Sequence, residues 1–252
     1  FLLGGFVNLL FALYTIKTKF SINFKLDFDW KVIKHIYSIS IAFALAGMFT
    51  RVYSYVDTLL INSYLGAKSV GWYSTAYKIP FALQFIPTAF AASLYPAMSD
   101  LYKKKSERLH VIFERSMFYL MLIAVPILGG IYSLAHEVIV QFYGQEFEPA
   151  VKVLQIMIFG ILFIFLNFPL GSLLSACNRQ KINTTFIGIT MVINIIANII
   201  LIPIFDMHGA AYAFLISHGF LFISTFAIAY KIIPVNSAFL IKKFMIKFLE
   251  KL

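Results

Sequence analysis

The chain has 252 residues, of which 61% are hydrophobic and 13% are charged, and its mean hydropathy is +0.85. A soluble domain carries about a quarter charged residues, so this chain has too few polar side chains to cover a surface in water. The composition therefore excludes an ordinary soluble protein and indicates an integral membrane protein. Cys177 is the single cysteine, which excludes an intrachain disulfide.

Apolar runs long enough to cross a membrane recur along the whole chain. A helix needs about 20 residues to span about 30 Å of hydrocarbon, and the runs lack the alternation of a transmembrane barrel. We therefore predict an all-α, polytopic transmembrane bundle of six complete helices, preceded by the end of a seventh. The first run has no basic leader or cleavage site and is not a signal peptide. The runs are 1–15, 36–63, 72–98, 116–136, 152–177, 182–204 and 209–231.

Basic residues gather in every second connecting segment. Seventeen of the 21 lysines and arginines fall in segments that would share one side of the membrane. By the positive-inside rule this side is the cytoplasm, so the net charge of +10 reports topology and predicts no nucleic-acid partner. The prediction is a multi-pass protein of the cytoplasmic (inner) membrane with a cytoplasmic C-terminus. Its parts would be a helix end (1–15), a cytoplasmic loop (16–35), a six-helix lobe (36–232) and a basic amphipathic cytoplasmic tail (233–252).

The last residues, "FLIKKFMIKFLEKL" (239–252), combine a basic face with an apolar one. Lys243, Lys247 and Lys251 recur every four residues, and Phe, Leu, Ile and Met fill the positions between them. This pattern is typical of a helix that lies in the membrane interface and is attracted to anionic lipid. A frayed basic tail is the alternative.

Two charged residues interrupt the apolar runs on either side of the turn "LGAKSVG" (65–71), which the charge pattern places outside. Asp57 precedes the turn and Lys78 follows it, and both would lie roughly 10–12 Å below the outer surface. A charge at the bilayer centre costs about 2.5–3.5 kcal/mol on insertion scales, so each needs a partner or a wet cavity. Equal depth on adjacent helices predicts an ion pair between Asp57 and Lys78.

Arg51 lies deeper and on another face, since six residues of helix place it about 120° from Asp57. It lines up with Ser40, Gly47, Ser54, Tyr55, Thr58 and Asn62, a set that we call the Arg51 stripe. Such a stripe normally faces a bundle interior or an aqueous cavity. The alternatives are that Arg51 and Lys78 extend toward the membrane surfaces, or that Asp57 and Lys78 only clasp two helices together. The candidate cavity residues are Arg51, Asp57, Lys78, Ser54, Tyr55 and Thr58.

Other polar rows are typical of helix packing. Asn183, Thr190, Asn194 and Asn198 share one side of the 182–204 run, and Gly209, Ala213 and Ser217 form a small-residue row in the last run. The histidines do not cluster as metal ligands, and no nucleophile elbow, phosphate loop or carboxylate pair occurs. We therefore expect no catalytic residue, no metal site and no enzyme activity.

Several stretches resemble a known transporter family in order and spacing. "YVDTLLINSYLGAKSVGWYSTAYKIP" with "PTAFAASLYPAMSDLYKK" resembles the seventh and eighth helices of polysaccharide flippases of the multidrug/oligosaccharidyl-lipid/polysaccharide exporter superfamily. "VPILGGIYSLAHEVIVQFYGQEFEPAVKVLQIM" resembles their ninth and tenth helices, and "LLSACNRQKINTTFIGITMVINIIANIILIPIFDMHGAAYAFLIS" their eleventh and twelfth. The resemblance covers roughly 36–232. It implies a C-terminal lobe, with residues 1–15 as the end of the sixth helix and an N-terminal six-helix lobe before them.

The resemblance implies alternating-access transport of a polyprenyl-pyrophosphate-linked oligosaccharide for polysaccharide biosynthesis. Arg51 and Lys78 would attract the pyrophosphate or acidic sugars, and Asp57 would organise them or bind a coupling proton or sodium ion. No other cofactor is implied. The implied partners are the lipid-linked oligosaccharide, membrane lipids and, as candidates, polysaccharide assembly proteins. The alternatives are a multidrug/cation antiporter of the same superfamily and a lipid II flippase. A glycan polymerase or ligase would need larger external loops, and a structural scaffold would not need Asp57 and Arg51 in the bilayer.

Overall fold

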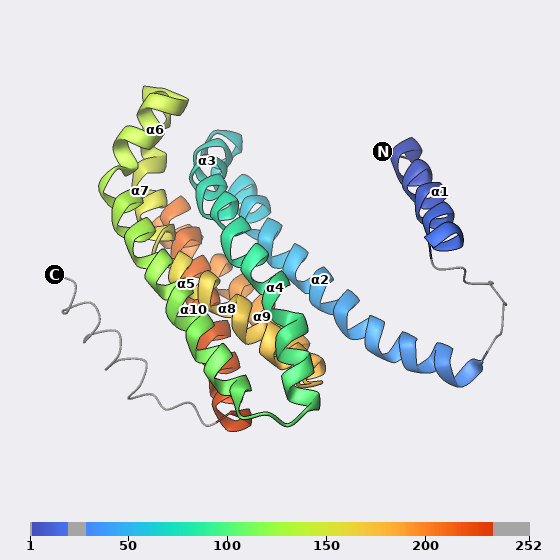
Figure 1. Ribbon diagram of the computed structural model, residues 1–252. Coiled ribbons are helices and arrows are strands. Elements are labelled where there is room, and N and C mark those ends of the chain that lie inside the picture. The colour runs from blue at the N-terminus through green and yellow to red at the C-terminus, as the bar shows by residue number, and fades with distance from the viewer. Residues whose placement is uncertain (1, 20–28, 234–252) are drawn as a thin grey trace. The chain divides into compact units, whose positions relative to one another are not determined.

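The computed structural model describes residues 2–19 and 29–233, and the regular elements in these ranges are all helical (Figure 1). The predicted all-α fold is confirmed. In chain order the helices are α1 (Leu2–Lys19), α2 (Trp30–Leu65), α3 (Ala67–Leu83), α4 (Phe85–Lys103), α5 (Arg108–Ser133), α6 (Ala135–Tyr143), the 3₁₀ turn η1 (Gln145–Phe147), α7 (Pro149–Met157), α8 (Gly160–Ala176), α9 (Gln180–Phe205) and α10 (Met207–Ile232).

Five helical segments within the described ranges are long and apolar enough to cross a membrane. The predicted run 36–63 lies inside α2, which is not one of the five. The other five complete runs each coincide with one of these segments. They are Ala67–Lys103, Arg108–Ser133, Pro149–Ala176, Gln180–Phe205 and Met207–Ile232.

The chain divides into two compact units after Ser40. The first unit contains α1 and the beginning of α2, and the second contains the rest of α2 and all later helices. Helices occupy both ends of the predicted loop 16–35, because α1 continues to Lys19 and α2 already begins at Trp30. The predicted interfacial tail, apart from Ile233, lies outside the described residues.

Short breaks separate successive helices, some of them inside the predicted runs. Gly66 alone separates α2 from α3, and its φ of 81° lies in the left-handed region that glycine adopts without strain. Gln84 separates α3 from α4 at a point flanked by Pro80 and Pro87, which each lack the N–H for a helical hydrogen bond. The segment 137–151, which connects the predicted runs 116–136 and 152–177, is itself mostly helical and is formed by α6, η1 and the start of α7.

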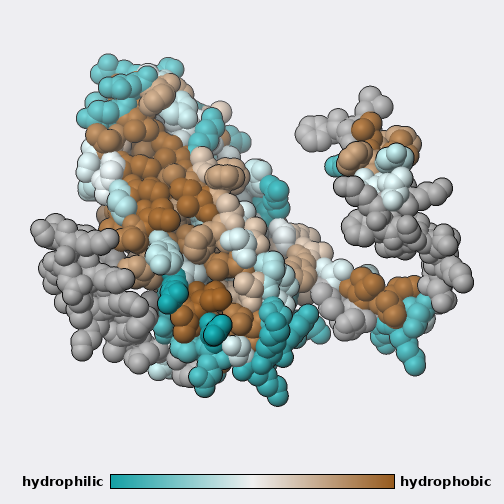
Figure 2. Space-filling view, in the orientation of Figure 1, coloured by the Kyte–Doolittle hydropathy of each residue, from teal (hydrophilic) through white to brown (hydrophobic). Residues whose placement is uncertain are grey.

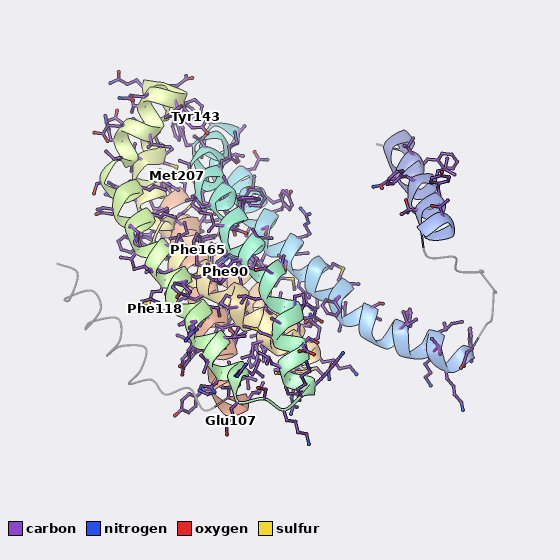
Figure 3. All side chains as sticks on the ribbon, viewed as in Figure 1. Phe90, Glu107, Phe118, Tyr143, Phe165 and Met207 are labelled. Atoms are coloured by element: carbon purple, nitrogen blue, oxygen red, sulfur yellow. The ribbon has the colours of Figure 1, made fainter. Side chains whose placement is uncertain are left out.

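The second unit has an apolar core in two parts. One cluster lies near the α6–α7 end and includes Phe165 and Met207, and the other lies toward the α4–α5 connection and includes Phe113 and Leu170. Figure 3 places Tyr143 and Met207 toward one end of the bundle, Phe165 in its middle and Glu107 at the opposite end. Figure 2 shows a hydrophobic band between polar ends, as a protein that spans a bilayer requires.

α9 and α10 form a close antiparallel pair. Asp206 alone separates them, with φ 54°, and the pair makes an extensive contact along its length. The predicted small-residue row of Gly209, Ala213 and Ser217 is buried on α10, which confirms that it serves packing.

Candidate transport site

Two faces of α2 carry the candidate residues, and they have different surroundings. Arg51 and Tyr55 are exposed on the surface of the second unit, with 58% of Tyr55 exposed. Asp57 is only 3% exposed. The angular separation predicted from the helical repeat thus distinguishes an outer face of α2 from an inner one.

The Arg51 stripe is exposed over much of its length and half-buried elsewhere. Gly47 and Asn62 are exposed like Arg51, while Ser54 and Thr58 are half-buried. The Ser54 hydroxyl donates to the Thr50 carbonyl at 2.8 Å, so it is satisfied within the helix. The face that remains available to a ligand or to another part of the protein is therefore the one that Arg51 and Tyr55 share.

Asp57 lies inside the bundle between three helices. The Tyr73 hydroxyl, on α3, donates to Asp57 Oδ2 at 2.7 Å, and Asn198 Nδ2, on α9, donates to Asp57 Oδ1 at 2.7 Å. Both partners are almost completely buried, Tyr73 at 1% and Asn198 at 0% exposure. Hydrogen bonds to a charged group contribute about 1.5–3 kcal/mol each, so these two bonds fasten α2 to α3 and α9.

The predicted ion pair between Asp57 and Lys78 is wrong. Within the described ranges the salt bridge that forms is Lys104–Asp100, at 2.7 Å. Lys78 is five residues after Tyr73, which is about 140° around α3, so it cannot share the face that Tyr73 turns toward Asp57. Depth was predicted from the helical rise alone, and equal depth does not bring two side chains to the same side of a helix.

Lys78 instead interacts with an aromatic ring at the end of α6. Its Nζ lies 5.8 Å from the centre of the Tyr143 ring, within the range of a cation–π interaction. The Lys78 side chain is exposed, so it is available to a ligand as well as to Tyr143. Asp57 and Lys78 therefore belong to separate places in the fold.

Asn194 and Asn198, which the sequence pattern assigned to helix packing, adjoin Asp57. Asn198 Nδ2 also donates to the Asn194 backbone carbonyl at 2.9 Å, and the Asn194 side chain lies beside the carboxylate. The side-chain oxygens of both asparagines are buried and accept no hydrogen bond. In the sequence, their spacing of four residues already indicated that both amides lie on one face of α9. The structure shows that this is the face that α2 contacts.

This cluster is rich in oxygen atoms and low in dielectric. We call Asp57, Tyr73, Asn194 and Asn198 the Asp57 cluster. A buried carboxylate beside two amide oxygens without donors suits a proton or a hard cation, because hard cations prefer oxygen ligands. Unsatisfied buried oxygens are otherwise costly, at about 1–3 kcal/mol each. In the described ranges, no three His, Cys, Asp or Glu side chains group as ligands for a metal ion.

Comparison with known proteins identifies relatives of this chain. The sequence model of the family described as "Polysaccharide biosynthesis protein" matches residues 1–152. The "Probable low-salt glycan biosynthesis flippase" of Haloferax volcanii is 28% identical over 69% of this chain and 36% of its own length. The teichuronic acid biosynthesis protein TuaB of Bacillus subtilis is 28% identical over 62% of this chain and 32% of its own length. The chain thus spans about a third of the length of these relatives.

Solved transporter structures share the fold. A MOP superfamily transporter from Pyrococcus furiosus matches with a TM-score of 0.64, at 17% identity, over 76% of this chain and 42% of that one. The inward closed conformation of the lipid II flippase MurJ matches with a TM-score of 0.60, at 19% identity, over 87% of this chain and 48% of that one. At these identities the likeness shows the fold.

Proposed function

Since the chain belongs to the polysaccharide biosynthesis protein family, we propose that it is the C-terminal lobe of a transporter that flips a polyprenyl-pyrophosphate-linked oligosaccharide across the membrane. The observation that carries this proposal is the exposed cationic face of α2, where the Arg51 and Tyr55 side chains are exposed on a helix that the sequence predicts to span the membrane. In a protein of two six-helix lobes, such a face borders the passage between the lobes. The protein is then a transporter and not an enzyme.

On this proposal Arg51 binds the cargo. A guanidinium presents a planar set of donors that matches phosphate oxygens, and it stays charged throughout the physiological pH range. Tyr55, four residues further along α2, offers an exposed ring and hydroxyl to the sugars. Lys78 and the Tyr143 ring form a second exposed place, farther toward the outer end, for an acidic or pyrophosphate group.

The Asp57 cluster has a different role, since it is closed to a bulky cargo. Asp57, at 3% exposure, is the site at which we propose that a coupling proton or sodium ion is bound. Such an ion supplies the driving force for the conformational change. The Asp57 carboxylate and the free amide oxygens of Asn194 and Asn198 would hold it, while Tyr73 and Asn198 fix the carboxylate in place.

The burial of Asp57 supports the flippase over a multidrug/cation antiporter. An organic cation needs an accessible carboxylate, and the accessible charge on α2 is the basic Arg51. An exposed cation suits an anionic cargo. A drug-resistance assay in cells with and without the gene separates the two activities, and a flippase gives no protection. A lipid II flippase would have the same fold and a cargo of similar chemistry. The two functions are distinguished by identifying which lipid-linked glycan accumulates when the gene is deleted.

The setting follows from the charge pattern. We propose that the protein lies in the cytoplasmic membrane with its C-terminus inside, because its basic segments gather on one side. Residues 36–232 would form the six-helix C-terminal lobe, with 1–15 as the end of the preceding helix. Polysaccharide assembly proteins are the partners to which a flipped oligosaccharide would pass.

The test is glycan display on cells that carry variants of the full-length protein. Arg51→Gln should reduce display strongly, while Arg51→Lys, which keeps the charge, should retain a substantial part. Asp57→Asn keeps the volume and should reduce display strongly with normal protein abundance. Lys104→Gln, which removes an exposed basic residue in the cytoplasmic segment, is the matched control and should display like the parent. Full display by both Arg51→Gln and Asp57→Asn would refute the proposed roles.

A further inference from the structure

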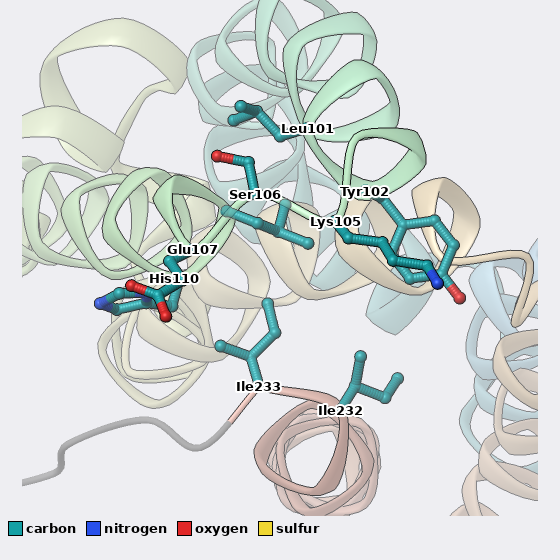
Figure 4. A pocket seen from close by; sticks show the side chains of 9 residues that line it. Leu101, Tyr102, Lys105, Ser106, Glu107, His110, Ile232 and Ile233 are labelled. Carbon is teal, nitrogen blue, oxygen red and sulfur yellow. The ribbon is translucent and has the colours of Figure 1, made fainter.

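A pocket of about 560 Å³ lies at the end of the bundle where α4 passes into α5 and where α10 ends. It is unrelated to the Asp57 cluster and to the exposed face of α2, since none of their residues line it. Figure 4 shows Leu101 and Ser106, from the α4–α5 side, opposite Ile232 and Ile233 at the end of α10. Lys105 and His110 also line the pocket.

The pocket has an apolar wall and a polar rim. Leu109 and Ile233 are buried, and Leu101 and Ile232 are half-buried. Lys105 is exposed at the rim, and Ser106 and His110 are half-buried beside it. Such a division fits a ligand with one apolar and one polar part better than it fits a soluble ion.

The α4–α5 connection beside the pocket carries an excess of positive charge, and of its lysines, arginines and carboxylates Lys105 and Glu107 line the pocket itself. Lys103, Lys104, Lys105 and Arg108 lie within six residues, against the two carboxylates of Asp100 and Glu107. Lys104 is neutralised by Asp100 at 2.7 Å, whereas Lys105 makes no salt bridge with any residue that the structure describes. Glu107 lines the pocket near His110, so the negative charge is at the His110 side of the rim and Lys105 is free on the other.

The position in the membrane matches this chemistry. The charge pattern places the α4–α5 connection on the cytoplasmic side, where anionic lipids concentrate. Tyr102, which lines the pocket, is 37% exposed, and Tyr230 near the end of α10 is 50% exposed. Exposed tyrosines favour the level of the lipid headgroups. The pocket therefore opens where a phospholipid has its phosphate and glycerol.

We propose that this pocket binds the headgroup of an anionic glycerophospholipid of the cytoplasmic leaflet. Lys105 attracts the phosphate, and Ser106 adds a hydroxyl. The glycerol and the first carbons of an acyl chain lie against Leu101, Ile232 and Ile233. A bound lipid would join the α4–α5 connection to the end of α10. The proposal needs the cytoplasmic orientation of this end but not the transport of any cargo.

The test measures lipid binding by the full-length protein in detergent. Native mass spectrometry and thermal melting are recorded with phosphatidylglycerol, with phosphatidylcholine and with inorganic phosphate. We expect phosphatidylglycerol to bind and to raise the melting temperature, with little effect from the other two. Lys105→Gln should weaken phosphatidylglycerol binding about five-fold, which corresponds to the attraction of one lysine to an anionic surface. Lys104→Gln is the control and should bind like the parent.

Each other outcome would overturn the proposal. Equal binding by Lys105→Gln and the parent would show that Lys105 holds no headgroup. An equal loss in Lys104→Gln would show general attraction to a basic surface and no defined pocket. If phosphatidylcholine bound and stabilised the protein as well as phosphatidylglycerol does, the pocket would not select an anionic headgroup. If inorganic phosphate did so, the apolar wall would have no part in binding. These measurements record lipid binding and not transport. The lipid-binding proposal can therefore be judged even if the proposed flippase function is refuted.

Discussion

Asp57 is held by neutral donors from two other helices and not by a cation. The tyrosine hydroxyl and the amide fix the position of the carboxylate through hydrogen bonds. Because both donors are neutral, they do not compensate its negative charge. This differs from an ion pair, in which a basic partner would already neutralise it. An uncompensated buried carboxylate is poised to take up a proton or a small cation.

The stability of single variants tests these contacts. Tyr73→Phe removes the donor to Asp57 Oδ2 and leaves a buried carboxylate with one bond fewer, which should cost about 1–3 kcal/mol. Lys78→Met removes a charge that does not contact Asp57 and should change stability by about 0.5 kcal/mol or less. The measurement is the melting temperature of each purified full-length variant. A larger loss for Lys78→Met than for Tyr73→Phe would restore the ion pair that the sequence suggested.

At this scale the sequence predicted which face of α2 each residue occupies better than it predicted the contacts of those residues. The separation of Arg51 from Asp57 came from the helical repeat, which any straight helix obeys. The partners of Asp57 depend on how α3 and α9 are rotated against α2, and single-sequence periodicity does not contain that rotation. The orphan oxygens of Asn194 and Asn198 needed the packed structure to be found.

Among the elements, α2 and the α9–α10 pair are joined to the bundle in different ways. α9 and α10 approach closely over their length through small residues. α2 relies more on individual side chains, including the bonds to Asp57, the Thr184 hydroxyl that donates to the Ala42 carbonyl at 2.9 Å, and the buried Ile61. A helix held by a few polar contacts can change its position when one contact changes, as ion binding at Asp57 would require.

The close approach of α9 and α10 makes Gly209 indispensable. A Cβ atom at this position would overlap the backbone carbonyl of Leu201, and a backbone atom cannot rotate away. Gly209→Ala should therefore separate the two helices and sharply lower the yield of folded protein in fluorescence-detected size-exclusion chromatography.

Gly171→Ala is the matched control, because its Cβ would lie 3.7 Å from Asn183 Nδ2, at ordinary contact distance. Alanine also favours a helix by about 0.8–1.0 kcal/mol over glycine. This variant should fold as well as the parent. Equal yields from Gly209→Ala and Gly171→Ala would contradict the tight packing of the hairpin.

The sequence predicted the helices well and their interruptions poorly. Long apolar runs identify helices because unpaired backbone groups are not tolerated in lipid. The break at Gln84 and the short helices α6 and α7 depend on local backbone turns inside or beside apolar runs, where hydropathy changes little. A proline alone does not predict such a break, since Pro126 and Pro169 lie inside the uninterrupted helices α5 and α8.

The whole molecule combines an exposed basic face with a closed carboxylate site. Within the second unit, Arg51 and Tyr55 are available to a large anionic ligand, and the Asp57 cluster is available only to something small. The same helix, α2, carries both. Binding at the inner face and binding at the outer face can therefore influence each other through a movement of one element.

Composition and charge distribution predicted the class of the molecule, because the solvent that surrounds a chain determines them over many residues. Under the proposed function, the choice of glycan would depend on shape and hydrogen bonding at the face of α2 and at parts of the protein outside this chain, which spans 36% of the length of the Haloferax volcanii relative. One helix face can select a cargo by its charge, but it does not determine which sugars the cargo contains.

The most direct measurement is flipping of a fluorescent polyprenyl-pyrophosphate oligosaccharide by the full-length protein in proteoliposomes, with and without an imposed proton or sodium gradient. The parent protein should flip the lipid and should do so faster with one of the gradients. Asp57→Asn should bind the lipid normally but lose the response to the gradient, and Arg51→Gln should lose binding. Gradient-dependent flipping by Asp57→Asn at the parent rate, or no flipping by the parent protein, would contradict the account.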